Sequence, residues 1–129
     1  FGCDVGKMLN RDLGIMDMDI YDYKNLFNIK SKMKKSTRLE YGDSVMTHAM
    51  LFTGVDIKEK KPQKWRVENS WGNKSGDQGY YLMSDNWFDE YNYEVVVDRK
   101  YLSKKILAIF DLEPIKLKPW DPMGALAVK

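Results

Sequence analysis

Residues 45–52 read Val-Met-Thr-His-Ala-Met-Leu-Phe, and residues 68–72 read Glu-Asn-Ser-Trp-Gly. The first stretch has the apolar composition of a buried strand and carries His48, the single histidine of the chain. The second places Asn69 and Trp71 at the end of the next predicted strand. A strand carrying a histidine, followed by a strand that ends in an asparagine, is the pattern from which we interpret the rest of the sequence.

The composition describes a chain of modest size and nearly balanced charge. Its 129 residues are 43% hydrophobic, which is sufficient for the core of one domain. The 21 basic and 19 acidic residues leave a net charge of +2, which gives no general attraction to nucleic acid or anionic membranes. We interpret the lysine-rich segments 30–35 and 58–61 as solvated loops. No stretch approaches the roughly 20 apolar residues of a membrane-spanning helix.

Two further features concern compartment and completeness. One cysteine excludes an internal disulfide and is compatible with a reducing compartment, and no basic-then-apolar leader marks secretion. The chain opens at Phe1 in what resembles the interior of a strand. Because such a strand needs neighbours to pair with, we expect the sequence to be a fragment of a larger domain.

The order of apolar and turn-forming segments predicts an α+β fold with four or five antiparallel strands and peripheral helices. We expect strands over 1–5, 44–55 (the clearest buried strand), 64–69, 79–83 and 93–98. We expect helices over 6–13, 19–27 (or a turn), 85–91 and 103–110, a hairpin loop over 58–63, and a glycine-rich turn over 72–79. Prolines beyond residue 112 predict an extended arm over 112–129, distinct from a strand-rich lobe over 1–111.

The pairing of His48 with Asn69 has to be weighed against a plain structural role, because a lone histidine on an apolar strand is more often a hydrogen-bonded core residue. From position 48 to position 69 is 21 positions, which suits two antiparallel strands joined by a long hairpin. An asparagine carbonyl beside one ring nitrogen would set the tautomer and leave the other nitrogen as a base. Trp71 is large and apolar enough to cover that bond.

Other chemistries find less support. One histidine and one cysteine without a ligand-spaced carboxylate cluster do not predict a metal site. Ser44 and Ser70 remain possible nucleophiles by composition, but neither lies in a Gly-x-Ser-x-Gly turn. Cys3 lies in the opening strand and not at the start of a helix, the setting that activates thiols, so we do not expect it to be a nucleophile.

Several motifs together resemble the bleomycin hydrolase and aminopeptidase C group of the papain-like cysteine proteases. The Asn-Ser-Trp-Gly run at 69–72, followed by Gly-Tyr at 79–80, resembles the asparagine block of papain-like enzymes, and His48-Ala49 resembles their histidine. The flanks extend the likeness over essentially the whole chain: FGCDVGK at 1–7, MTHAM at 46–50, WRVENSWG at 65–72, YEVVVDRK at 93–100 and WDPMGALA at 120–127.

The resemblance implies a papain-like fold and a role for each matching residue. His48 would be the general base, Asn69 would orient its ring, and Trp71 would shield the pair. The arm would lie in the active-site cleft and restrict the enzyme to peptides with free amino termini, through Gly124, Ala125, Leu126 and Ala127. The resemblance also implies a cytoplasmic homohexamer without cofactor or metal.

The nucleophilic cysteine and the oxyanion-hole glutamine of that group would precede Phe1, so we expect this chain alone to be inactive. An alternative is a non-catalytic binding or assembly module with the same fold, although such a module has no need to retain His48, Asn69 and Trp71 together. A nucleic-acid binder would rest only on the lysine-rich segments, and it would bind with steep salt dependence.

Overall fold

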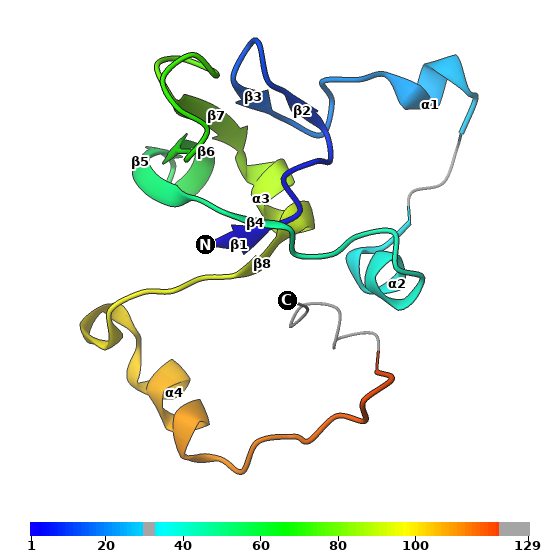
Figure 1. Cartoon of the computed structure of the whole chain (residues 1–129). Coiled ribbons are helices and arrows are strands. Elements are labelled where there is room, and N and C mark those ends of the chain that lie inside the picture. The colour runs from blue at the N-terminus through cyan, green and yellow to red at the C-terminus, as the bar shows by residue number, and fades with distance from the viewer. Residues whose placement is uncertain (30–32, 122–129) are drawn as a thin grey trace.

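The computed structural model describes residues 1–29 and 33–121 and contains eight strands and several short helices (Figure 1). The strands are β1 (Gly2–Cys3), β2 (Leu9–Asn10), β3 (Ile15–Met16), β4 (His48–Ala49), β5 (Leu51–Lys58), β6 (Lys61–Glu68), β7 (Tyr80–Ser84) and β8 (Asn92–Glu94). The helices are α1 (Tyr23–Leu26), α2 (Lys35–Glu40), α3 (Asp85–Tyr91) and α4 (Lys104–Leu107), with 3₁₀ turns η1 (Arg99–Tyr101) and η2 (Ala108–Asp111).

The strands form two sheets. The larger has the order β2-β3-β7-β6-β5, and the smaller has the order β4-β1-β8. Every described strand pair is antiparallel except β3 with β7, which are parallel. The α+β architecture with mainly antiparallel strands, predicted from the sequence, is therefore confirmed.

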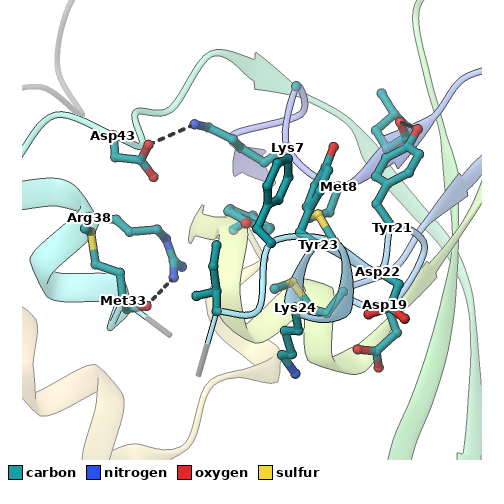
Figure 2. A pocket seen from close by; sticks show the side chains of 16 residues that line it. Lys7, Met8, Asp19, Tyr21, Asp22, Tyr23, Lys24, Met33, Arg38 and Asp43 are labelled. Atoms are coloured by element: carbon teal, nitrogen blue, oxygen red, sulfur yellow. Dashed lines mark hydrogen bonds and ion pairs between the residues drawn. The ribbon is translucent and has the colours of Figure 1, made fainter. Parts of the chain in front are cut away.

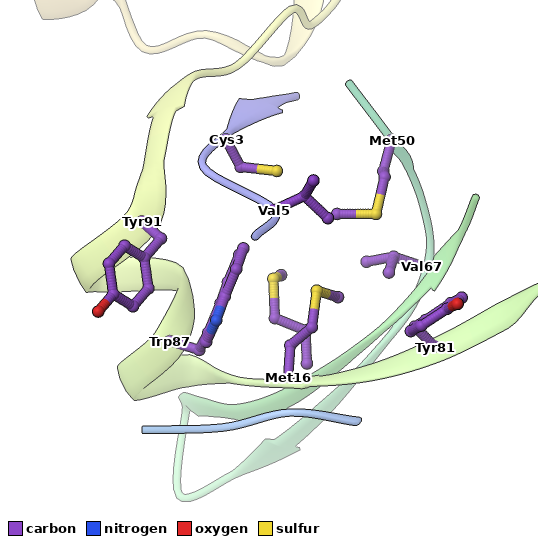
Figure 3. Close-up of a cluster of buried hydrophobic side chains, with 9 residues drawn as sticks. Cys3, Val5, Met16, Met50, Val67, Tyr81, Trp87 and Tyr91 are labelled. Carbon is purple, nitrogen blue, oxygen red and sulfur yellow. The ribbon is translucent and has the colours of Figure 1, made fainter. Parts of the chain in front are cut away.

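The hydrophobic core brings both sheets together with α3 (Figure 3). Trp87 of α3, Met83 of β7 and Cys3 of β1 are fully buried in it. The Trp87 indole N–H donates to the carbonyl oxygen of Lys7 at 2.8 Å, so the one polar atom of this large side chain is satisfied. The complete buried cluster consists of Cys3, Val5, Met16, Met50, Val67, Tyr81, Met83, Trp87 and Tyr91.

The β5–β6 hairpin differs from the prediction in its turn and in its burial. Glu59 and Lys60 both have positive φ, 51° and 64°, as a two-residue hairpin turn of type I′ requires, so the predicted loop over 58–63 is mostly strand. Pro62 precedes Lys64, the first residue of β6 that pairs with β7. On that side it has no neighbouring strand, so its missing N–H costs no hydrogen bond to β7. The expected buried strand over 44–55 is wrong in its character: β5 is an edge strand and largely exposed.

The predicted helix over 6–13 is also wrong. Met8 has a positive φ of 49°, and the segment turns into the β2–β3 hairpin, in which Leu9 pairs with Met16. Met8 and Leu9 pack against the core from this hairpin. The spacing of apolar residues that predicted a helix therefore reflects burial of these side chains in a different backbone conformation. Gly14 lies in the turn between the two strands and does not end a helix.

Other boundaries shift for local reasons. Residues 30–32 of the lysine-rich segment predicted as a loop lie outside the described residues, and its last residue, Lys35, begins α2 and donates to the carbonyl oxygens of Asp89 at 2.8 Å and Asn92 at 2.5 Å. Ser84 precedes α3 as predicted, but its hydroxyl makes no capping hydrogen bond to that helix. Ser103 does cap α4, accepting from the backbone N–H of Ile106 at 3.3 Å.

The last part of the chain leaves the body of the fold after β8, and the predicted strand over 93–98 is confined to its first residues (Figure 1). Residues 112–121 form no helix or strand, and Ile115 and Trp120 are 88% and 79% exposed. The division into a lobe over 1–111 and an arm over 112–129 stays a prediction, since residues 122–129 lie outside the described part of the chain.

Gly76 tests how tightly the 72–79 loop packs. Gly76 and Gly42 have similar left-handed φ values of 62° and 67°, so an alanine is strained at either position. A Cβ at Gly76 would collide with the Tyr80 carbonyl oxygen, whereas a Cβ at Gly42 meets nothing within 4 Å. Gly76→Ala should therefore lower the free energy of unfolding by about 1–3 kcal/mol more than Gly42→Ala. Urea unfolding of both variants measures the difference, and equal losses would contradict the packing described here.

Candidate active site

His48 is positioned by the smaller sheet. In the β1–β4 pair it lies opposite Cys3, and the backbone N–H of Thr47 donates to the Cys3 carbonyl oxygen at 2.9 Å. Two residues further on, the N–H of Met50 donates to the carbonyl oxygen of Phe1 at 3.0 Å. These bonds anchor the strand on both sides of His48, whose side chain is half-buried.

Asn69 is positioned by the larger sheet. It follows β6 directly, and the pairing of Leu51 with Glu68 brings it next to the start of β5. Its backbone N–H donates to the carbonyl oxygen of Gly79 at 3.0 Å, and the residue is only 9% exposed. The expected meeting of His48 with Asn69 across an antiparallel hairpin is confirmed.

The hydrogen bonds between and around these side chains define the tautomer of the histidine. Nε2 of His48 lies 2.7 Å from Oδ1 of Asn69, and the same Oδ1 accepts the backbone N–H of Ser70 at 2.8 Å. Because the Ser70 N–H needs an acceptor, the amide oxygen and not the amide nitrogen faces the ring. Nε2 therefore carries the proton and donates it, and Nδ1 is left with its lone pair. None of the described residues is hydrogen-bonded to Nδ1.

Trp71 lies against this pair. The centroids of the His48 and Trp71 rings are 5.0 Å apart, with an angle of 33° between the planes. The Nδ2 atom of Asn69 is buried without a hydrogen-bond partner in the described part of the chain. The Trp71 ring therefore lies beside a hydrogen bond that is itself part-buried.

The remaining candidates from the sequence do not join the pair. Ser44 is 1% exposed, donates to Oδ2 of Asp4 at 2.8 Å and lies 2.5 Å from the hydroxyl of Tyr93, so its hydroxyl is already used. Ser70 contributes its backbone N–H, a role that its residue type does not signal. No cluster of three potential metal ligands occurs among residues 1–29 and 33–121. Gly124, Ala125, Leu126 and Ala127 lie outside the described residues.

A cavity of about 1110 Å³ lies away from the pair, between α1, α2 and the segment that leads into β2 (Figure 2). Three of its charged side chains already have partners: Lys7 and Asp43 form an ion pair at 3.3 Å, and Arg38 donates to the Met33 carbonyl oxygen at 2.9 Å. Arg38 also pairs with Glu90 at 2.6 Å. Neither His48 nor Asn69 lines this cavity.

Among residues 1–29 and 33–121, no helix has both the length and the apolar character of a membrane-spanning segment.

Cys3 is unsuited to nucleophilic chemistry. Burial, with a smaller contribution from the Asp4 carboxylate, raises the pKa of its thiol from 9.0 to about 12, against a lowering effect of the nearby amino terminus. A thiol with this pKa stays protonated at neutral pH and is 0% exposed. The expectation that Cys3 is not an activated thiol agrees with both observations.

Alkylation with iodoacetamide at pH 8 tests the state of Cys3. Because a pKa of about 12 in place of 9.0 leaves on the order of 10³-fold less thiolate, the folded chain should react at least that much more slowly than the chain in guanidinium chloride. The rate is followed by intact mass, and the chain in denaturant is the control. Equal rates in the two conditions would show that the thiol is accessible and ionisable in the folded chain.

Comparison with known proteins gives the wider context of this geometry. The Peptidase C1-like family model matches residues 1–124. The chain is 52% identical to aminopeptidase C of Listeria innocua over 99% of its length, and 54% identical to bleomycin hydrolase of Homo sapiens over 98%. The crystal structure of PepW from Lactobacillus rhamnosis HN001 superposes with a TM-score of 0.88 at 52% identity, covering 98% of this chain.

In each of these comparisons the chain spans only 29% of the length of the other protein. The likeness nevertheless includes almost every residue of this chain, and it includes the fold as well as the sequence. The chain belongs to the Peptidase C1-like family and has its papain-like fold.

Proposed function

We propose that this chain is the C-terminal part of a cytoplasmic cysteine aminopeptidase of the bleomycin hydrolase type. His48 is its general base, Asn69 orients the imidazole, and Trp71 shields the pair from water. The observation that carries the proposal is the 2.7 Å bond from Nε2 of His48 to Oδ1 of Asn69, which leaves Nδ1 as a base. The likeness to aminopeptidase C and bleomycin hydrolase supports the choice of reaction.

In the proposed reaction, Nδ1 of His48 takes the proton of a cysteine thiol, and the thiolate attacks the carbonyl carbon of the first peptide bond. The tetrahedral intermediate then collapses as the imidazolium gives its proton to the leaving amine. Water, deprotonated by Nδ1, attacks the resulting thioester and releases the amino acid. Throughout these steps Asn69 keeps the proton on Nε2, so that Nδ1 alone exchanges protons with the reactants.

The nucleophile has to come from outside these 129 residues. Cys3 is the only cysteine of the chain, and its thiol is buried with a raised pKa. The proposal therefore assigns the cysteine and the oxyanion-hole glutamine to a part of the protein that precedes this sequence. It follows that the chain alone does not hydrolyse peptides.

The arm over residues 112–129 is proposed to lie in the active-site cleft, where its end receives the free amino terminus of a peptide substrate. Gly124, Ala125, Leu126 and Ala127 would line that site. The exposure of Ile115 and Trp120 supports an arm that packs on something other than this lobe. Assembly into a homohexamer completes the proposal, which includes neither metal nor cofactor and no nucleic-acid or membrane partner.

Labelling with an epoxide probe for papain-like thiols tests where the nucleophile lies. In the longest natural protein that contains this chain, intact and peptide mass spectrometry should find one adduct, on a cysteine that precedes Phe1. This chain alone should remain unlabelled because its only thiol is buried. An adduct on Cys3 would refute the assignment of the nucleophile, and no adduct on either form would favour a non-catalytic binding or assembly module.

Substitutions in the same longer protein test the two site roles. His48→Ala should lower kcat/KM for an aminoacyl substrate by about 10²–10⁴-fold, because it removes the general base. Asn69→Ala should cost less, about two- to tenfold, because it removes one orienting hydrogen bond. Gln63→Ala, an exposed change on the same hairpin, serves as the control. If His48→Ala retains the activity of the control, His48 is not the base.

A further inference from the structure

The Trp71 ring needs side-chain contacts to hold its position. Trp71 lies beyond the end of β6, and the next residue, Gly72, has a positive φ of 81°, so no strand pairing orients the indole. The ring packs against the edge of the hydrophobic core, and two rings and one cation of the described residues lie against it. They are the His48 imidazole at 5.0 Å, the Tyr81 ring at 5.9 Å in edge-to-face geometry, and the guanidinium carbon of Arg11 at 4.3 Å.

The backbone of Arg11 is fixed to the part of the fold that carries Trp71. The carbonyl oxygen of Arg11 accepts the backbone N–H of Gly76 at 3.2 Å, and that of Gly14 accepts the N–H of Leu82 at 2.8 Å. A Cβ at Gly14 would come within 2.8 Å of the Gly76 Cα, so the two turns are in close contact. The β2–β3 turn therefore delivers the guanidinium to the indole from a rigid support.

The guanidinium of Arg11 is suited to this contact. A planar, weakly hydrated cation stacks on an indole face better than an ammonium group does. No ion pair that involves Arg11 occurs among the described residues, and the indole is the partner that the structure gives to its charge. The chain also contains a comparable exposed stack that does not touch the histidine: Arg66 lies 3.7 Å from the Tyr80 ring centroid.

We infer that Arg11 is a positioning residue, which holds Trp71 against the His48–Asn69 hydrogen bond from the side of the β2–β3 turn. Its effect passes through Trp71, because Arg11 has no described contact with His48 or Asn69. The consequence for catalysis rests on the proposed function, but the protection of the hydrogen bond from water does not. Only the test of catalysis needs the nucleophile and a peptide substrate.

Nitrogen-15 NMR on the 129-residue chain measures the protection directly, since His48 is its only histidine. Arg11→Ala should raise the exchange rate of the His48 Nε2 proton with water by about two- to fivefold, the effect of one exposed cation–π contact. Arg11→Lys should restore part of the protection, because it keeps a cation but not the planar stack. Arg66→Ala removes the other stack and should leave the rate unchanged. An unchanged rate in Arg11→Ala, or an equal increase in Arg66→Ala, overturns the inference.

Kinetics on the longest natural protein then separate this inference from the proposed function. Arg11→Ala should lower kcat about two- to fivefold with KM unchanged, and Arg11→Gln, which keeps the side-chain length without the charge, should behave in the same way. Altered proton exchange combined with hydrolysis that survives His48→Ala would refute the proposed function and leave the role of Arg11 standing. If His48→Ala abolishes hydrolysis while Arg11→Ala changes neither hydrolysis nor the exchange rate of the His48 Nε2 proton, the role of Arg11 is refuted and the proposed function stands.

Discussion

The antiparallel pairing of β5 with β6 is the constraint on which the site depends. Leu51 pairs with Glu68 at the open end of the hairpin, and this pairing brings β4, which carries His48 and precedes β5, close to Asn69, which follows β6. A shift of the hairpin by one residue would turn every side chain to the opposite face and separate His48 from Asn69. The turn at Glu59 and Lys60, with both residues in the left-handed region, sets the register at the far end, and two register irregularities, at Phe52/Gly54 and Asp56/Ile57, lie between that turn and the open end.

The pair is supported by two different sheets, which makes its geometry a property of the whole lobe. His48 belongs to the three-stranded sheet through its pairing with Cys3, and Asn69 follows a strand of the five-stranded sheet. The core that joins the sheets includes Trp87 and Met83, both fully buried. Each fully buried side chain of this size contributes about 1.5–3 kcal/mol to stability, so the core keeps the two sheets together far more firmly than the hydrogen bond between His48 and Asn69 does.

Burial has opposite consequences for the two reactive side chains of the lobe. Cys3 lies inside the core, where desolvation raises the pKa of its thiol and removes it from chemistry. His48 is only half-buried, so one nitrogen meets Asn69 inside the protein while the ring remains near the surface. The proton transfer proposed for His48 needs this intermediate position, because the ring has to be oriented by the protein and still reach a reactant.

The sequence by itself determined the strand-rich α+β class, the family and the neighbours of His48. The alternation of apolar and polar residues over 64–69 and the spacing between His48 and Asn69 can be read directly from the sequence, because both depend only on the order of residues along the chain. Tertiary structure alone decided that residues 6–13 lead into the β2–β3 hairpin and form no helix, because Met8 and Leu9 reach the core from this hairpin as well as they would from a helix. It also decided that β5 is an exposed edge strand. The residues of a strand do not indicate whether other elements of the fold cover it. The stack of Arg11 on Trp71 joins residues 60 positions apart, and only the contact between the two turns brings them together.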